Sequence, residues 1–226
     1  MSQLDWKENL TPINRQFDDI YYADEDGLAE ARYVYLLNNS LPEKWKPKSD
    51  YAIAELGFGT GLNFFAVLDL WFRNKMEDSK LRYSSCEKFP LTGDDITKAL
   101  SRWPELQPQL KNFLTVYDPQ RPGFQKIKLS TNVELDLFIG DVSEFLSQLQ
   151  SPIDTWFLDG FAPRKNPEMW SDEVFDRVLK LSSPSASFAT FAAAGFIRRG
   201  MLDRGFQVSK VAGFGRKREM LRGHLA

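Results

Sequence analysis

The sequence predicts an α/β fold: a mostly parallel, seven-stranded sheet with helices on both faces, preceded by an N-terminal extension. Two observations carry this prediction. Short apolar runs alternate with helical patterns from residue 51 onward, which is typical of a parallel sheet covered by helices. Acidic residues stand at the ends of four successive apolar runs, at the edge where open α/β sheets bind their ligands.

Residues 1–50 are predicted to form the extension, packed on one globular domain of residues 51–226. Within the extension, residues 27–39 have a helical pattern that follows an acidic cluster. Its expected buried face comprises Leu28, Ala31, Tyr35 and Leu36. A connector rich in Pro and Lys, residues 41–50, then leads to the domain.

The domain begins with an apolar strand at residues 51–56. A glycine-rich loop follows and opens an apolar helix over residues 63–72. A second strand is expected at residues 81–86, and a helix at residues 94–103.

In residues 124–141, apolar and polar side chains alternate on both sides of a Ser-Thr-Asn turn. This pattern predicts a hairpin whose second arm, residues 133–139, enters the sheet. Further apolar strands are expected at residues 154–159 and 187–194, on either side of a helix at residues 172–181. The chain then has two strand patterns joined by a tight basic turn, and we expect the last strand to be inserted antiparallel.

The strongest local signal is the loop from Glu55 to Gly61, with glycines at 57, 59 and 61 around Phe58. Alternate glycines allow a sharp turn and the close approach of a ligand to the backbone. The spacing differs from the GxGxxG dinucleotide fingerprint, and an acidic residue before GxGxG is common in S-adenosylmethionine sites. We therefore expect S-adenosylmethionine as cofactor and a Rossmann-like methyltransferase fold. The alternative is a structural turn in another α/β enzyme.

Three further acids stand at strand ends. Glu87 can accept hydrogen bonds from both ribose hydroxyls, or it is simply a solvated glutamate. Asp141 is placed to accept from the adenine amino group and to cap the next helix. Asp159, before Gly160, ends the fourth core strand and is expected over the cofactor methyl group, with a turn-forming Asp-Gly as the alternative. Together these acids predict a cofactor cleft.

The composition excludes several classes of site. The net charge of −2 gives no global positive field, so any RNA contact needs a local patch. A single cysteine, Cys86, and a single histidine, His224, argue against a disulfide framework, a Cys-rich metal site or a histidine triad. We expect no metal. No signal peptide or membrane span is visible, which favours a cytoplasmic protein.

Basic residues gather late in the chain, at Arg198, Arg199, Arg204, Lys210, Arg216, Lys217, Arg218 and Arg222. They can hold RNA phosphates, or they form an ordinary solvated surface. Several aromatic residues lie near loops that border the expected cleft and can stack a base: Phe17, Tyr21, Tyr22, Phe161 and Trp170. Most other aromatic residues are expected in the core.

Several stretches resemble the methyltransferase domain of the MnmC family, the bifunctional tRNA 5-methylaminomethyl-2-thiouridine biosynthesis proteins. They are FDDIYY (17–22), DGLAEARYVYLLNNSLPEKW (26–45), AELGFGTGLNFFAV (54–67), EKFPL (87–91), WPEL (103–106), WFLDGFAPRKNPEMW (156–170), FATF (188–191) and GFGRKREML (213–221). The long blocks at 156–170 and 213–221 are far more specific than the glycine loop. Arg164 and Gln125-Lys126 depart from the commonest family pattern.

The resemblance implies methylation of the primary amine of 5-aminomethyl-2-thiouridine at the tRNA wobble position, which makes the tRNA anticodon loop a partner. Many members carry a C-terminal flavin-dependent oxidase that produces this amine. The 226 residues contain no second glycine-rich nucleotide motif, so the oxidase is not expected within them. The chain is then either a free-standing methyltransferase, with a separate flavin-dependent oxidase as a partner, or the excised methyltransferase domain of a bifunctional enzyme.

We hypothesise that Asp159 accepts a proton from, or hydrogen-bonds, the substrate amine. Glu55 and Asn63 are expected to hold the methionine end of the cofactor. Glu87 and Asp141 are expected to hold the adenosine. The expected cofactor site also includes Gly57, Phe58, Gly59, Gly61 and Lys88. The candidate substrate and tRNA contacts are Asp18, Phe161, Lys165, Arg216 and Lys217.

Three other functions are compatible with parts of the sequence. A small-molecule amine methyltransferase fits the acidic net charge and the glycine loop. A non-catalytic cofactor-binding or tRNA-binding module would serve a separate oxidase. A nicotinamide dehydrogenase is disfavoured by the glycine spacing and by the lack of an obvious Tyr-Lys or His catalytic pair.

Overall fold

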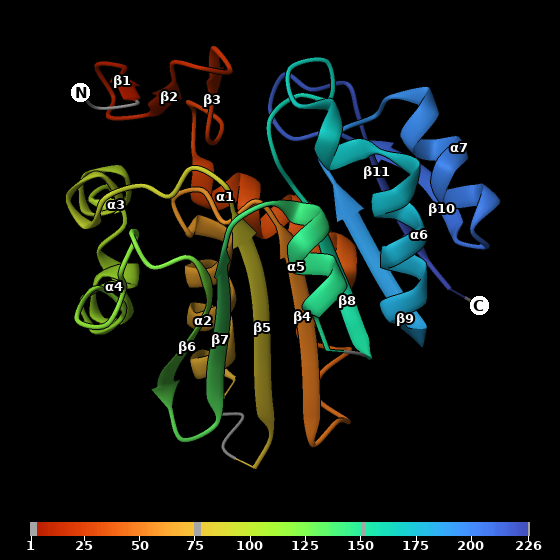
Figure 1. Cartoon of the computed structure of the whole chain (residues 1–226), viewed down its shortest axis with the longest axis horizontal. Helices are drawn as coiled ribbons and strands as arrows, with labels where there is room; N and C mark the ends of the chain where they lie inside the picture. The colour runs from red at the N-terminus through yellow and green to blue at the C-terminus, as the bar shows by residue number, and fades with distance from the viewer. Residues whose placement is uncertain (1–3, 75–77, 151, 226) are drawn as a thin grey trace.

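The computed structural model describes residues 4–74, 78–150 and 152–225 (Figure 1). Its strands form two sheets. The small sheet comprises β1 (Leu4–Trp6), β2 (Pro12–Asn14) and β3 (Asp19–Ile20). The central sheet comprises β4 (Asp50–Leu56), β5 (Lys80–Glu87), β6 (Gly123–Ser130), β7 (Val133–Ile139), β8 (Ile153–Leu158), β9 (Ser182–Thr190), β10 (Gln207–Ala212) and β11 (Glu219–His224).

The described central sheet has the strand order β10-β11-β9-β8-β4-β5-β7-β6. Its pairings place six strands in one direction, while β6 and β11 run the opposite way. The mostly parallel α/β fold is thereby confirmed, together with the antiparallel insertion of the last strand between β9 and β10. The predicted number of seven strands was wrong, because both arms of the hairpin join the sheet: β6 pairs with β7 from Gly123↔Ile139 to Ser130↔Val133.

The helices are α1 (Gly27–Ala31), α2 (Leu62–Arg73), α3 (Gly93–Leu100), α4 (Gln107–Leu114), α5 (Val142–Gln148), α6 (Asp172–Leu181) and α7 (Gly195–Asp203). Short 3₁₀ turns lie at Pro104–Leu106 and Pro167–Trp170. None of the described helices is long and apolar enough to cross a membrane.

Two hydrophobic cores lie on opposite faces of the sheet, because side chains alternate along each strand. In β4, Tyr51 and Ile53 join the core that contains α2 to α4 and the N-terminal segment. Ala52 and Ala54 join the core that contains α5 to α7. Figure 1 shows α5 and α6 in front of the sheet and α2 behind it.

The N-terminal segment lies across the upper edge of the sheet in Figure 1, where β1 to β3 and α1 stand near the carboxyl ends of the parallel strands. Asp26 caps α1 by accepting from Ala29 N at 3.1 Å. The predicted helix continues as a π-helical turn (Arg32–Leu36) and a 3₁₀ turn (Leu37–Asn39), and its expected apolar face is buried.

Some element boundaries differ from the prediction. The helix expected to reach residue 103 ends at Leu100, because Trp103 precedes Pro104 and is extended, with φ −118° and ψ 94°. Strand β9 begins at Ser182 rather than at residue 187, since its first residues are polar and partly exposed and so lack an apolar pattern. The sequence prediction also missed α4, α7 and the small sheet.

Candidate functional site

A cavity of about 710 Å³ opens at the carboxyl ends of β4, β5, β7 and β8, within the range of about 300–1,000 Å³ usual for small-molecule sites. The predicted cofactor residues that line it are Gly57, Phe58, Gly59, Asn63, Glu87, Lys88, Asp141 and Asp159. The predicted substrate contacts that line it are Phe161, Lys165, Arg216 and Lys217. Three predicted residues, Glu55, Gly61 and Asp18, are not part of its wall.

The glycine loop joins β4 to α2 and needs its glycines for two different reasons. Gly57 has φ +92°, and a Cβ there would lie 3.4 Å from Cα of Gly160, which belongs to the loop after β8. Gly61 has φ +76°, and a Cβ there would lie 2.8 Å from the ring of Phe58. Gly57 lets the loops after β4 and β8 meet at the cavity, whereas Gly61 leaves space for the ring of Phe58 to pack against the turn.

Glu87, the last residue of β5, fixes the glycine loop. Its Oε2 accepts from Gly59 N at 2.8 Å, and its Oε1 accepts from Phe89 N at 2.8 Å. Burial raises the pKa of Glu87 above its ordinary value, although both backbone hydrogen bonds oppose this shift. Each oxygen retains a lone pair, so the carboxylate can accept further hydrogen bonds from a ligand in the cavity.

Asp141 follows β7 and has the expected capping role. Its Oδ1 accepts from the backbone N of Ser143 at 2.9 Å, at the start of α5. Its Oδ2 lies 3.0 Å from Nζ of Lys88, which also lies 3.0 Å from Glu168. Burial acts to raise the pKa of Asp141, but the hydrogen bonds from Ser143 and Lys88 outweigh it and hold this pKa below its usual value.

Asp159, immediately after β8, is a half-buried carboxyl group in the cavity wall. Its Oδ2 accepts from Asn63 Nδ2 at 2.8 Å, and its Oδ1 accepts from Gly160 N at 2.7 Å. Burial raises the pKa of Asp159 to about 6. The carboxyl group is therefore mostly ionised at neutral pH but is a stronger base than an exposed aspartate.

Glu55 lies behind the cavity, not in it, and its side chain is fully buried. It shares the orientation of Ile53 and Tyr51 in β4 and so points toward α2. Its Oε1 accepts from Asn63 Nδ2 at 2.9 Å, and its Oε2 accepts from Ser85 Oγ at 2.8 Å. Burial, together with the charge of Asp159, raises the pKa of Glu55 to about 8.

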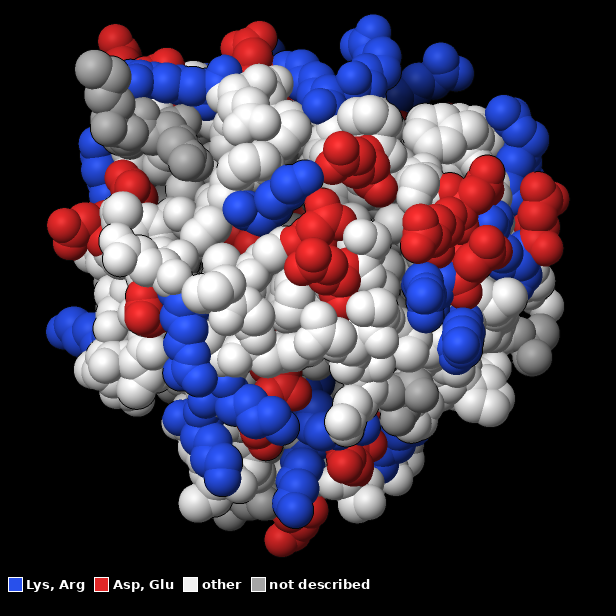
Figure 2. Space-filling view, in the orientation of Figure 1, with Lys and Arg blue, Asp and Glu red and all other residues white. Residues whose placement is uncertain are grey.

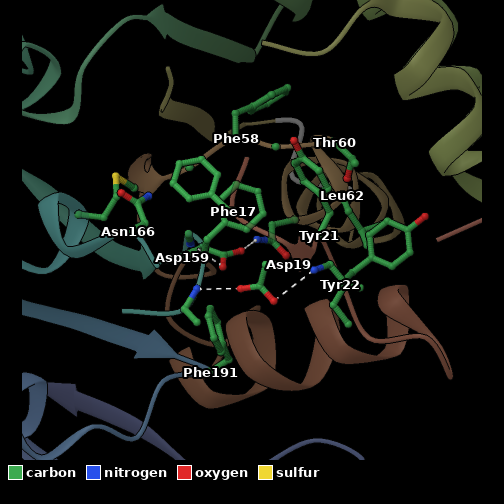
Figure 3. Close-up of a pocket in the computed structure, with 18 of the residues that line it drawn as sticks. Phe17, Asp19, Tyr21, Tyr22, Phe58, Thr60, Leu62, Asp159, Asn166 and Phe191 are labelled. Atoms are coloured by element: carbon green, nitrogen blue, oxygen red, sulfur yellow. Dashed lines mark hydrogen bonds between the residues drawn. The ribbon is translucent and has the colours of Figure 1, made fainter. Parts of the chain in front are cut away.

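Aromatic rings cover one side of the cavity (Figure 3). Phe17 and Phe161 are stacked with their ring centroids 4.6 Å apart, and Tyr21 contacts Phe161 edge-on at 5.2 Å. Trp170 was expected to border the cleft, but this was wrong: its ring is buried in the core and its Nε1 donates to the Phe161 carbonyl at 3.2 Å. The phenol of Tyr22 is also mostly buried.

The expected basic contacts differ in their environment. Lys165 donates to the backbone oxygen of Asp18, whose own side chain is 97% exposed. Arg216 is 96% exposed and lies 3.5 Å from Glu25. Lys217 was expected to contact phosphate, yet its Nζ already lies 2.8 Å from Oε1 of Glu30.

The sequence prediction missed several residues of the N-terminal segment that line the cavity. Asp19, rather than its neighbour Asp18, is in the wall, and its Oδ2 accepts from Ala162 N at 3.0 Å (Figure 3). Tyr35 also lines the cavity, and its buried hydroxyl acts on the carboxyl group of Asp159, where it opposes the rise in pKa that burial causes. The resemblance of residues 17–22 was the one available signal for Asp19, whereas Tyr35 was predicted only as part of an apolar face.

The chemistry of this cavity fits S-adenosylmethionine. Its wall contains the carboxyl groups of Glu87, Asp141 and Asp159, which match a ligand with cationic sulfonium and ammonium groups. Gly59 allows the Tyr21 ring, which also lines the cavity, to pack closely on the glycine loop, since a Cβ on Gly59 would lie 3.1 Å from that ring. Aromatic rings line the remainder and suit a flat, conjugated group.

A parallel sheet with an inserted antiparallel strand, a glycine loop and acidic strand ends together define the class of Rossmann-like S-adenosylmethionine-dependent methyltransferases. A family model described as S-adenosyl-L-methionine-dependent methyltransferase matches residues 104–226, more than half of the chain. The chain belongs to this family, and its cofactor is S-adenosylmethionine.

Relatives extend the likeness over nearly the whole chain. A tRNA 5-methylaminomethyl-2-thiouridine biosynthesis bifunctional protein MnmC from Ectopseudomonas mendocina is 47% identical over 226 residues, which cover 98% of this chain and 34% of that protein. The protein of the same name from Chromobacterium violaceum is 44% identical over 229 residues, which cover 100% of this chain and 34% of that protein. The chain thus spans about a third of the length of these relatives. These matches confirm the resemblance to the methyltransferase part of that family.

A solved structure gives a further match. The crystal structure of MnmC2 from Aquifex aeolicus superposes with a TM-score of 0.75 at 21% identity, covering 99% of this chain and 70% of that one. At this identity the match supports the fold alone.

Proposed function

We propose that this chain transfers the methyl group of S-adenosylmethionine to the primary amine of 5-aminomethyl-2-thiouridine at the tRNA wobble position. The product is 5-methylaminomethyl-2-thiouridine. The observation that carries this proposal is the 47% identity, over 226 residues, to a protein named for the biosynthesis of that nucleoside. The proposal covers the methyl transfer alone, and a flavin-dependent oxidase, either a separate chain or another domain of the same protein, is the proposed supplier of the amine.

Asp159 is the proposed catalytic residue. Bound S-adenosylmethionine supplies an electrophilic methyl group on a good leaving group, so the chain must chiefly align the amine and remove its proton. An aminomethyl group is largely protonated at neutral pH. The pKa of Asp159 near 6, raised by burial, leaves the carboxylate ionised and able to accept that proton.

The remaining acids and amides are assigned to cofactor binding. Glu87, already fixed by two backbone donors, is the proposed acceptor for the ribose hydroxyls. Asp141 and its partner Lys88 are assigned to the adenine end. Asn63 donates both amide hydrogens to carboxyl groups, so its free carbonyl oxygen is the proposed acceptor for the methionine ammonium.

The stacked rings of Phe17 and Phe161 are the proposed platform for the substrate base. A wobble base lies in a single-stranded loop, so turning it into a cavity requires little unstacking. Lysine and arginine side chains gather along the upper edge of the molecule in Figure 2, above the carboxyl ends of the strands, and can contact the flanking phosphates. Lys165 and Arg216, both at the cavity rim, are the proposed contacts nearest the base.

We also propose that residues 1–50 act as one unit with the domain of residues 51–226. The support is the wall of the cavity, which includes Asp19 and Tyr35 of the first segment and Asp159 of the second. A bond from Ala162 N to Asp19 joins the two segments at the rim.

The proposal is tested with methyl-labelled S-adenosylmethionine and tRNA from cells that lack this modification but still make the amine. The tRNA is digested to nucleosides after the reaction, and label is expected in 5-methylaminomethyl-2-thiouridine. Label in a different nucleoside, or none with RNA but efficient methylation of free amines, would refute the tRNA assignment.

A further inference from the structure

Two carboxyl groups share one amide nitrogen at the floor of the cavity. Nδ2 of Asn63 lies 2.9 Å from Oε1 of Glu55 and 2.8 Å from Oδ2 of Asp159. Both hydrogens of this amide are therefore used. The orientation of the amide is fixed, because the opposite orientation would set its oxygen against two carboxyl groups.

Glu55 is enclosed by neutral and acidic groups. Its side chain is fully buried and accepts hydrogen bonds from Asn63 and Ser85. The Tyr83 hydroxyl acts on it as a third, neutral donor that favours the charged form, but burial outweighs the three donors. The titratable groups that act on it electrostatically come from the surrounding elements: Tyr83 and Cys86 of β5, Tyr35 after α1, and Asp159 after β8. None of these groups is a cation. A buried carboxylate without a cationic partner is unstable in its charged form.

We propose that Glu55 is a neutral positioning residue, which keeps its proton at neutral pH and acts through Asn63 to hold the carboxylate of Asp159 in the cavity. Two negative charges joined by one neutral donor repel each other, so one carboxyl group retains a proton. Glu55 is the more deeply buried of the two, and burial raises its pKa to about 8, against about 6 for Asp159. The proton therefore belongs on Glu55.

The hydrogen bonds are compatible with a protonated Glu55. Its carbonyl oxygen accepts from Asn63, and its hydroxyl group can donate to Ser85, since a serine hydroxyl accepts as well as donates. This role differs from the direct contact with the cofactor's methionine end that the sequence predicts, because Glu55 does not reach the cavity. The use of Asp159 as proton acceptor rests on the proposed function, whereas the proton on Glu55 does not.

The first experiment observes the proton without any substrate. Infrared difference spectra of the folded protein are recorded across neutral to alkaline pH for the wild type, Glu55→Gln and Asp141→Asn. A protonated carboxyl band should disappear as pH rises through about 8 in the wild type and in Asp141→Asn, and be missing in Glu55→Gln. A wild-type spectrum without this band, or a band that persists in Glu55→Gln, overturns the proposal.

The second experiment separates positioning from charge. Glutamine has the shape and neutrality of a protonated glutamate, so Glu55→Gln should transfer methyl about tenfold faster than Glu55→Ala in single turnovers at neutral pH. The ratio of the wild-type rate to the Glu55→Gln rate should fall as pH rises through about 8 and Glu55 ionises, because deprotonation of the substrate amine raises both rates alike. Equal rates for the two variants, with both folded, would overturn the positioning role of a neutral Glu55.

Cofactor affinity, measured by calorimetry without RNA, serves as the substrate-independent control for both variants. If the wild type binds S-adenosylmethionine but methylates no tRNA, the proposed function fails while the infrared result still decides the state of Glu55. If tRNA is methylated but the infrared band is absent, the inference fails alone.

Discussion

Lys217 and Glu30 form an ion pair of 2.8 Å, although 187 residues separate them along the chain. Glu30 is nearly buried in α1 and also accepts from Ala23 N at 2.7 Å. Nζ of Lys217 lies 4.3 Å from the centre of the Phe191 ring. The basic turn after β10 is thereby fixed against α1, and the ammonium of Lys217 has partners within the protein.

Lys217→Met should lower the free energy of unfolding by about 1 kcal/mol, since it leaves Glu30 buried without its cation while solvent screens the half-exposed lysine. Urea denaturation measures this difference. Arg216→Met is the matched control, because its guanidinium is 96% exposed and its loss should change stability far less. Equal losses in the two variants would show that the burial of Glu30 does not matter.

In tRNA binding the ranking of the two variants should reverse: Arg216→Met should lose more affinity than Lys217→Met. Arg216 is 96% exposed and has only a solvent-screened pair with Glu25 at 3.5 Å, so Arg216→Met should weaken binding and reduce the slope of log affinity against log salt by about one unit. Lys217→Met should change that slope less, because Lys217 is paired with Glu30. Filter binding at several salt concentrations measures both slopes. A larger change for Lys217→Met would mean that RNA displaces Glu30.

Asp159→Asn should reduce the single-turnover rate of methyl transfer by about 10²- to 10⁴-fold, the usual range for a lost general base. Higher pH should restore part of the rate, because a larger fraction of the substrate amine is then unprotonated. Rates are measured with saturating cofactor, whose affinity is determined separately by calorimetry. A variant with the wild-type rate and pH profile would exclude Asp159 as the proton acceptor.

Glu87→Gln should weaken S-adenosylmethionine binding by about tenfold, which corresponds to about 1.4 kcal/mol. A glutamine can accept from only one of the two backbone donors, Gly59 N and Phe89 N, and faces the other with an NH₂ group. Calorimetry with the cofactor and with S-adenosylhomocysteine measures the effect. Unchanged affinity for both would remove Glu87 from the cofactor site.

The wild-type protein should lose stability as pH rises from about 4.5 to 8 relative to Glu55→Gln. The pKa of Glu55 is raised by folding, from 4.5 to about 8, so the folded state binds more protons than the unfolded state in this window. Stability falls with pH wherever the folded state binds the additional proton. Urea unfolding at several pH values gives the difference between the two proteins. A difference that does not vary with pH would contradict the assignment.

Much of this site follows from local sequence. The glycine loop and the acids Glu87, Asp141 and Asp159 were expected at strand ends, and the topology brings them to one cavity. Glu55 was predicted to contact the cofactor, although the alternation of side chains along β4 indicates that it points into the core. Tyr51, Ile53 and Glu55 point the same way in β4, and the first two lie in the core beneath α2.

The contribution of the N-terminal segment was harder to predict. Its strands β1 to β3 have only two or three residues each, too short for a period of two to be recognised. Asp19 and Tyr35 reach the cavity through contacts that no local pattern encodes, such as the bond from Ala162 N to Asp19 across 143 residues. The eighth strand was missed for a simpler reason, because a hairpin pattern does not say whether both arms join the same sheet.

The pairing of Glu30 with Lys217 also constrains the order in which the cavity can form. A ribosome makes the segment of Asp19 and Glu30 before the turn that carries Lys217, yet the two meet in the folded structure. The N-terminal segment therefore lacks its final partners until β8 and β10 have been synthesised and have joined the sheet. Contacts of such long sequence separation require the closure of a long loop, which costs chain entropy and slows folding. The complete cavity wall therefore requires the chain through the turn after β10, and a nascent chain that stops short of that turn has the glycine loop but lacks Arg216 and Lys217 of the wall.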